Sequence, residues 1–171
     1  METRVNGILR KLLCYQDGNV MMFVAKGNLS SPFLSTSYLE MMEPIPSSIS
    51  SFDNDHYFAG LDVIHELTSI HNMVTIKYTS RKENITAIFK DFVVSGPEDQ
   101  YALEKDLTFS INGTYTTVPG TKGMKFSTFD SDNDGNPDEN CAEIYGAWWH
   151  TSDCDESFTF EDGFQMVLLP S

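Results

Sequence analysis

Apolar and polar positions alternate most regularly in the middle of the chain. The segments "MVTIKYTS" and "ITAIFKDFVVS" are rich in β-branched and aromatic residues and flank the polar tetrapeptide "RKEN". This pattern predicts two strands joined by a hairpin turn, with Val74, Ile76 and Tyr78 on one face of the first strand. The flanking segments "HYFAG" and "QYALEKDLTFSING" predict further strands, and "TTVPGTKG" predicts a loop.

One segment between these strands has the spacing of a helix. In "LDVIHELTSI" the apolar residues Ile64, Leu67 and Ile70 recur every third position, and Asp62 stands where an N-cap residue belongs. We therefore expect a brief helix here. The overlapping stretch "HELTSIH" superficially resembles a zinc-protease motif, but its histidines, His65 and His71, are six residues apart and so fall on different helix faces. We expect no catalytic activity.

The N-terminal part of the chain gives weaker patterns. "ILRKLLCY" fits a short helix, "NVMMFVAKG" fits a strand, and "MEPIPSSISS" is typical of a linker. We divide the chain into a poorly assigned segment, residues 1–51, and one domain over residues 52–171. Within that domain we expect a sheet part at about 52–123 and a loop-rich acidic lobe at about 124–171. The prediction is an α+β fold with a mainly antiparallel, twisted sheet and few short helices.

Length and charge narrow the function classes. A chain of 171 residues suits one domain, and it has no run approaching the roughly 20 apolar residues that a membrane span needs. The formal net charge is -14, and the segment from Phe126 onward holds eleven acidic residues and no Lys or Arg. Such a segment repels phosphate groups, so we expect no nucleic-acid binding and regard a cation as the natural partner.

The acidic residues concentrate in "DSDNDGNPDEN". Its aspartates stand at even spacings, at Asp130, Asp132, Asp134 and Asp138. Alternating carboxylates in a turn can direct several oxygens at one hard cation such as calcium, although the twelfth position is Cys141 and not the glutamate of an EF-hand loop. The alternative is a surface turn that binds nothing. Mutual repulsion among the carboxylates favours the metal.

Three cysteines and three glycosylation motifs bear on the compartment. Cys14, Cys141 and Cys154 allow one disulfide and leave one thiol. A bridge between the last two, 13 residues apart, would contribute roughly 3 kcal/mol, whereas in a reducing cytosol both would be small core residues. Between them "GAWWH" holds both tryptophans, which serve either as core or as part of a binding recess. Asn-x-Ser/Thr motifs make three asparagines candidates for glycosylation: Asn28, Asn84 and Asn112.

Several motifs together resemble a known family. "GMKFSTFDSDND", "NCAEIYGAWWH", "YFAGLDVIHELTS" and "FKDFVVSGPEDQYAL" are similar to the fibrinogen C-terminal-like globular domain of fibrinogen chains, ficolins, tachylectins and angiopoietins. The resemblance runs from about Phe52 to Cys154. It implies a calcium site built from the side chains of Asp132 and Asp134 and from main-chain carbonyls, whose nearest counterparts are Asn136 and Asp138. It also implies a disulfide between Cys141 and Cys154.

The resemblance further implies a ligand pocket beside the disulfide. In members that act as lectins, an aromatic residue and the peptide before the second cysteine bind acetyl groups or sugars. Their counterparts belong to a set of six candidate contact residues: Tyr145, Trp149, His150, Asp153, Cys154 and Asp155. We therefore expect a secreted, calcium-dependent recognition domain for acetylated or other glycans, of the innate-immune type. The alternatives are an extracellular protein-interaction or matrix module, or a truncated member that has lost ligand binding.

The chain also departs from the family pattern. Asp155 replaces the usual histidine, and "DESFTFEDG" stands where the family supplies further pocket residues and a late strand, so we expect an incomplete domain. "FQMVLLPS" resembles the closing strand of the family. The N-terminus lacks the apolar core of a signal peptide, so we expect a secreted protein's natural start to lie outside this chain. Multimers in the family arise through upstream regions, which leaves oligomerisation possible.

Overall fold

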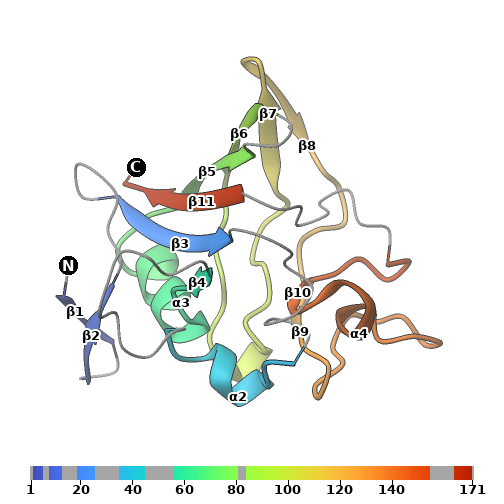
Figure 1. The fold of residues 1–171 in the computed structure, drawn as a ribbon. Coiled ribbons are helices and arrows are strands. Elements are labelled where there is room, and N and C mark those ends of the chain that lie inside the picture. Colours follow the sequence, from blue (N-terminus) through green and yellow to red (C-terminus); the bar gives the residue numbers. More distant parts are fainter. Residues whose placement is uncertain are drawn as a thin grey trace.

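The computed structural model describes residues 2–5, 8–12, 19–25, 35–44, 56–80, 84–154 and 164–170. Their main feature is a seven-stranded antiparallel sheet, seen in Figure 1. In spatial order its strands are β4 (His56–Phe58), β3 (Val20–Ala25), β11 (Phe164–Leu169), β5 (Thr75–Ser80), β6 (Ile85–Lys90), β7 (Thr108–Ile111) and β8 (Thr114–Thr117). The expected α+β fold with a mainly antiparallel sheet is confirmed, as is each of the strands expected around the central hairpin.

The two ends of the chain meet in the middle of this sheet. Strand β11, close to the C-terminus, pairs with β3 on one side and with β5 on the other. Its residues Met166, Val167 and Leu168 are buried, as expected for a strand with neighbours on both sides. Because β3 precedes residue 52, part of the segment that the sequence left unassigned belongs to the main sheet.

Two local predictions were wrong. Residues 8–11, expected in a helix, form strand β2 (Ile8–Lys11), which pairs with β1 (Glu2–Val5). Strand β8 (Thr114–Thr117) begins before the expected loop of residues 116–123 and takes up its first two residues, because Asn112 and Gly113 form a tight turn that returns the chain along β7. Both turn residues have positive φ values, 57° and 86°, which match the two-residue hairpin turn that an Asn-Gly pair favours.

The predicted helix is confirmed as α3 (Leu61–Ser69), but it begins at Gly60 and not at Asp62. Gly60 has a φ of 90°, and a Cβ atom there would lie 2.6 Å from the main-chain carbon of Glu43, so only glycine fits. The carboxylate of Asp62 instead accepts a hydrogen bond of 2.5 Å from the hydroxyl of Tyr101. The start of α3 is therefore set by close backbone packing and not by a side-chain cap.

Short elements carry the rest of the described chain. These are α2 (Tyr38–Met41), the 3-10 helix η2 (Pro97–Asp99), β9 (Phe126–Ser127), α4 (Cys141–Tyr145) and β10 (Trp148–Trp149). Strands β9 and β10 pair with each other, and in Figure 1 they lie with α4 in a lobe beside the main sheet. None of the helices among the described residues combines the length and apolarity that crossing a membrane requires.

One hydrophobic core joins the sheet, α3 and the lobe. Buried residues of the sheet and of α3 belong to the same cluster as Phe126 and Trp149 of the lobe. The ring of Trp149 meets Phe126 edge-on at 4.7 Å and Phe92 edge-on at 5.4 Å, which are favourable aromatic geometries. Ile70, expected on the buried face of the helix, lies past its end and is exposed. The lobe is thus built onto the core of the domain.

Candidate functional site

Asparagines anchor the acidic loop to the body of the domain. The side-chain amide of Asn133 donates to the carbonyl of Phe126 at 2.9 Å, and its Oδ1 accepts a hydrogen bond of 2.8 Å from Gln100. At the other end of the loop, Asn140 donates to the carbonyl of Thr128 at 3.0 Å and caps α4. Sequence reasoning did not assign these anchors. The sequence signal for them was the alternation of asparagines with aspartates in "DSDNDGNPDEN".

The first aspartate of the loop is a structural tether. Oδ1 of Asp130 accepts hydrogen bonds from the main-chain N–H of Tyr38 at 2.9 Å and from the hydroxyl of Thr128 at 2.7 Å. The first of these joins the loop to the start of α2. Asp130 is thereby placed apart from the four residues expected to hold calcium.

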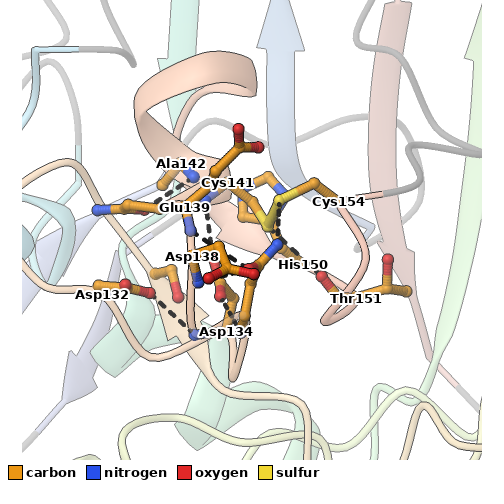
Figure 2. Close-up of a disulfide and its surroundings, with 12 residues drawn as sticks. Asp132, Asp134, Asp138, Glu139, Cys141, Ala142, His150, Thr151 and Cys154 are labelled. Atoms are coloured by element: carbon orange, nitrogen blue, oxygen red, sulfur yellow. Dashed lines mark hydrogen bonds between the residues drawn. A yellow bond between two sulfur atoms is a disulfide. The ribbon is translucent and has the colours of Figure 1, made fainter.

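Asp134 links the loop to the disulfide region (Figure 2). Its Oδ1 accepts a hydrogen bond of 2.8 Å from the N–H of Asn136, and its Oδ2 accepts one of 2.8 Å from the N–H of Cys141, the first residue of α4. Asp132 makes a weaker contact, 3.4 Å from its Oδ1 to the N–H of Asp134. One carboxylate thus holds both the turn of the loop and the start of the helix.

The donor atoms in the loop suit a hard cation. Asp132 is exposed, and within the described residues no hydrogen bond ends on the main-chain carbonyl of Asn136 or Asp138. Carboxylate and carbonyl oxygens are the ligands that calcium prefers. Oδ1 of Asn136 is engaged by the N–H of Asp138 at 2.9 Å, so the side chain shapes the turn and leaves the carbonyl for an ion. The four residues expected at the metal site therefore fit calcium.

The predicted disulfide between Cys141 and Cys154 is confirmed, with 5.3 Å between the Cα atoms. Both sulfurs lie within 4.8 Å of an Asp134 oxygen, but a bridged pair has no thiolate to offer a metal. The Cys141 sulfur also lies 3.5 Å from the carbonyl oxygen of Thr151, but a bridged sulfur carries no proton and so donates no hydrogen bond. The amide of Asn136 donates to the Cys154 sulfur at 3.4 Å, so loop and bridge touch directly. Cys14 lies outside the described residues.

Removing the bridge should destabilise the domain. We expect the double substitution Cys141→Ala and Cys154→Ala to lower the free energy of unfolding by about 3 kcal/mol, because the bridge restricts the unfolded chain over a 13-residue separation. Urea denaturation followed by tryptophan fluorescence measures this change. The double variant should show the same midpoint with and without reductant. A wild-type midpoint that does not move on reduction would contradict the prediction.

The six expected ligand-contact residues occupy different environments. Tyr145, the last residue of α4, is 42% exposed, Asp153 is exposed, and Cys154 is buried in the bridge. Trp149 is 4% exposed, and its indole N–H donates to the carbonyl of Tyr101 at 2.7 Å. This burial places Trp149 in the core, from where it supports the lobe without offering a contact surface.

His150 is also buried, at 1% exposure. Its Nε2 lies 2.7 Å from the carbonyl of Gly146 and is therefore the protonated nitrogen, which donates this hydrogen bond. The rings of His150 and Tyr145 are 6.5 Å apart, so the histidine lies beneath the exposed tyrosine. Asp155 lies outside the described residues. The structure thus leaves Tyr145 and Asp153 as the accessible members of the expected pocket.

Two tyrosines with buried hydroxyl groups, Tyr38 and Tyr101, lie beside the lobe. Burial, with a smaller effect of the hydrogen bond to Asp62, raises the pKa of Tyr101 far above its usual range. Burial raises the pKa of Tyr38 to about 12, and the two rings lie 6.3 Å apart. Both side chains stay neutral at physiological pH. The charge of this region consequently comes from the carboxylates of the loop.

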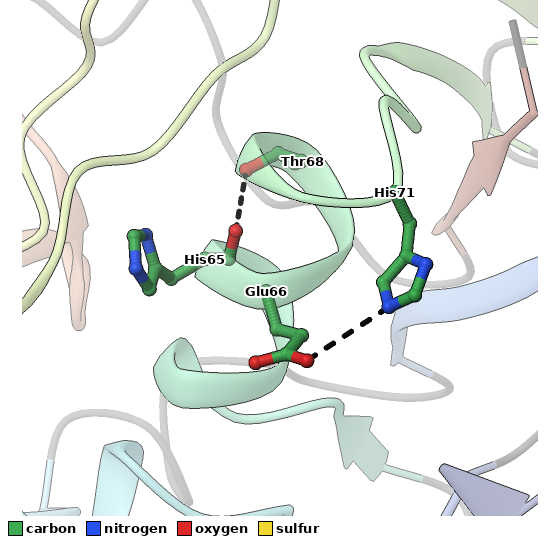
Figure 3. A network of polar contacts seen from close by, with 4 residues as sticks. All are labelled: His65, Glu66, Thr68 and His71. Atoms are coloured by element: carbon green, nitrogen blue, oxygen red, sulfur yellow. Dashed lines mark hydrogen bonds and ion pairs between the residues drawn. The ribbon is translucent and has the colours of Figure 1, made fainter. Parts of the chain in front are cut away.

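The histidines of "HELTSIH" do not form a chelating pair. Figure 3 shows His65 and His71 on opposite sides of α3. Nδ1 of His65 lies 2.8 Å from the carbonyl of Val94, while Nε2 of His71 lies 3.8 Å from Glu66. The zinc-protease geometry that the sequence only superficially suggests is absent from this part of the described chain.

These features can now be compared with known proteins. Residues 41–161 match the family described as fibrinogen beta and gamma chains, C-terminal globular domain. The chain belongs to this family. Fibrinogen C-terminal domains are in general binding modules and not enzymes. The match begins at residue 41, ahead of the boundary expected near residue 52.

Individual relatives agree with this assignment. Mouse tenascin-R is 35% identical over 99 residues, which is 56% of this chain but only 7% of tenascin-R. The fibrinogen-like globe domain of human ANGPTL2 covers 99% of this chain at 17% identity, with a TM-score of 0.68 and 91% of its own length matched. Lamprey fibrin D-dimer in complex with the peptide Gly-His-Arg-Pro-amide covers 95% of this chain and 64% of its own length, at 18% identity and a TM-score of 0.57. The shared fold is that of the fibrinogen-like globe.

Proposed function

We propose that this fibrinogen C-terminal domain is an extracellular recognition module that binds calcium in its acidic loop and a glycan or other acetylated ligand beside Tyr145. The observation that carries the proposal is the double role of Asp134. Its carboxylate bonds to the N–H of Asn136 in the loop and to that of Cys141 at the start of α4. An ion held by the loop would therefore also fix the helix that carries Tyr145.

The charge of the lobe supports the metal. Eleven acidic residues follow Phe126 without one Lys or Arg to offset them. Calcium bound by Asp132 and Asp134 would neutralise the two side chains whose repulsion otherwise strains the loop. Because the ion binds the folded form, its binding energy adds to the stability of the domain.

The disulfide supports an extracellular location. Bridges form and persist mainly in oxidising compartments, and Cys141 and Cys154 form such a bridge. Membership of the fibrinogen C-terminal family agrees with this compartment. The proposed ligand is accordingly one that is met outside the cell.

The exposed part of the pocket suits a small polar ligand with an apolar face. The ring of Tyr145 can pack against a methyl group or the apolar face of a sugar, while its hydroxyl and the carboxylate of Asp153 can bond to ligand hydroxyl or amide groups. Because Trp149 and His150 are buried, they would set the position of Tyr145 without touching the ligand.

A polypeptide ligand is the second candidate. Phe129, Ile144 and Tyr145 are exposed large hydrophobic side chains of the same lobe, which favours an apolar contact wider than one sugar. The acidic surface around them would attract a basic partner. Lamprey fibrin D-dimer, which has the same fold, was solved with a peptide that contains arginine and histidine.

Binding with and without calcium separates these candidates. We expect the full chain to bind acetylated glycans on an array in calcium, to lose at least tenfold of that binding in chelator, and to lose it also in Tyr145→Ala. Ile144→Ala, a change on the same helix, is the matched control and should leave glycan binding unchanged. A basic peptide that binds, with no glycan signal and with loss in Ile144→Ala, would favour the polypeptide. Binding unaffected by chelator would contradict both forms of the proposal.

A further inference from the structure

One edge of the main sheet is formed by β8, a short strand that, within the described residues, carries no lysine and no proline against pairing with another chain. The four residues of β8, Thr114–Thr117, are all exposed and include no charge and no proline. The opposite edge is β4, which has only three residues. Tyr115 on β8 is 47% exposed and Ile111 on β7 is 43% exposed. Natural proteins commonly guard such an edge with lysines, prolines, bulges or a covering segment.

Two glycosylation motifs stand at this end of the sheet. Asn112 opens the turn from β7 to β8, and Asn84 directly precedes β6. Ala87 pairs with Ile111, so the two turns are neighbours, and from strand spacing their asparagines lie roughly 10 Å apart. In Figure 1 the β7–β8 hairpin points away from the lobe that carries α4. A group attached here would leave the proposed binding site uncovered.

Both asparagines are in a state that accepts modification. Asn84 and Asn112 are exposed, with φ values of 54° and 57°, and neither side chain makes a hydrogen bond within the described part of the chain. The motif threonines, Thr86 and Thr114, are exposed as well. A Cβ atom added at Gly113 would meet nothing within 4 Å, so space around that turn is open. By contrast, the asparagines of the acidic loop are all engaged by their neighbours.

We propose that Asn84 and Asn112 carry N-linked glycans that together shield the β8 edge. In the transfer, the amide nitrogen of asparagine forms a bond to the anomeric carbon of an oligosaccharide. That carbon's bond to a lipid pyrophosphate breaks, the pyrophosphate leaves with the bonding electrons, and the amide gives up one proton. No oxidant or reductant is involved. The glycan at Asn112 lies at the head of the exposed strand, and the glycan at Asn84 lies over the adjacent turn.

Occupancy can be read directly from mass. The full chain, secreted from eukaryotic cells behind an added signal peptide, is treated with peptide N-glycosidase in heavy-oxygen water and analysed as peptides. Heavy oxygen that appears at Asn84 and Asn112 only when the enzyme is present marks glycan release, because an enzyme-free incubation in the same water measures spontaneous deamidation of the Asn112–Gly113 pair. Thr86→Ala and Thr114→Ala should each remove one glycan, whereas Thr116→Ala, an exposed threonine outside the motif, should remove none. Either motif variant with the mass pattern of the wild type would overturn the paired assignment.

Shielding is tested by sedimentation of the same proteins. Thr86→Ala/Thr114→Ala should self-associate at concentrations where the glycosylated chain is monomeric, and adding Thr116→Lys should restore the monomer by charging the bare edge. Equal sedimentation of the glycosylated and doubly unmodified chains would overturn the shielding. Calcium and ligand binding do not enter either measurement, so failure here is distinct from failure of the proposed function.

Discussion

Replacing Trp149 with alanine is expected to lower the free energy of unfolding by about 4 kcal/mol, the range found for large aromatic side chains lost from a core. The ring is 4% exposed and meets Phe92, Phe126 and Trp148 edge-on at centroid distances of 5.4, 4.7 and 5.0 Å. Its loss also strands the carbonyl of Tyr101, which now accepts the indole N–H. For a domain of this size, the change corresponds to a fall of roughly 8–16 °C in melting temperature.

Two further substitutions distinguish residues that stabilise the core from residues that contact the ligand. Trp148→Ala changes the neighbouring, half-buried tryptophan and should cost about half as much stability. Tyr145→Ala alters an exposed side chain and should change stability by less than about 1 kcal/mol while weakening ligand binding. Chemical denaturation and ligand titration of all three variants give the comparison. If Trp149→Ala kept wild-type stability but lost ligand binding, Trp149 would be a ligand contact and not a core residue.

The regular strands were predictable because their signal is local. Alternation in "MVTIKYTS" and "ITAIFKDFVVS" marks β5 and β6, whereas β11 was expected from the resemblance of "FQMVLLPS" to the closing strand of the family. What the sequence could not supply was the order of strands, since the pairing of β11 with β3 joins opposite ends of the chain. The start of α3 was misplaced for a similar reason. Close packing of Gly60 against residues 42–44 fixes it, and that contact has no signature in the local pattern.

In the lobe, the sequence motif predicted the disulfide but did not predict which side chains are buried. The family motif correctly paired Cys141 with Cys154, because the spacing of the two cysteines travels with the rest of the motif. Burial within "GAWWH" was not readable from the residues, since either tryptophan could have faced inward. The pairing of β10 with β9 decides it by setting Trp149 opposite Phe126 in the core. The anchoring role of Asn133 and Asn140 was not predicted, because the loop was interpreted through its carboxylates alone.

Asp134→Ala is expected to destabilise the domain both without and with calcium. Without the ion it removes two charge-assisted hydrogen bonds, each 2.8 Å long, to the N–H groups of Asn136 and Cys141. A hydrogen bond to a charged group contributes about 1.5–3 kcal/mol, so the loss of two should total about 3–6 kcal/mol. In calcium at 100 times its dissociation constant, the wild type gains a further ~2.7 kcal/mol that the variant does not. Melting curves in chelator and in calcium measure both parts.

Asp132→Ala is the matched control, because it removes a proposed ligand with little structural role. Among the described residues its side chain makes one hydrogen bond, to the N–H of Asp134, which is long at 3.4 Å, so stability in chelator should match the wild type to within about 0.5 kcal/mol. In calcium it should lose the same ~2.7 kcal/mol as Asp134→Ala, since both variants lose the ion. In chelator, a lower melting temperature for Asp134→Ala than for Asp132→Ala tests the link from the loop to the disulfide. In calcium, the loss of stability that both variants share relative to the wild type tests the metal site. A wild type that melts at one temperature with and without calcium would refute the metal site while leaving the Asp134 link intact.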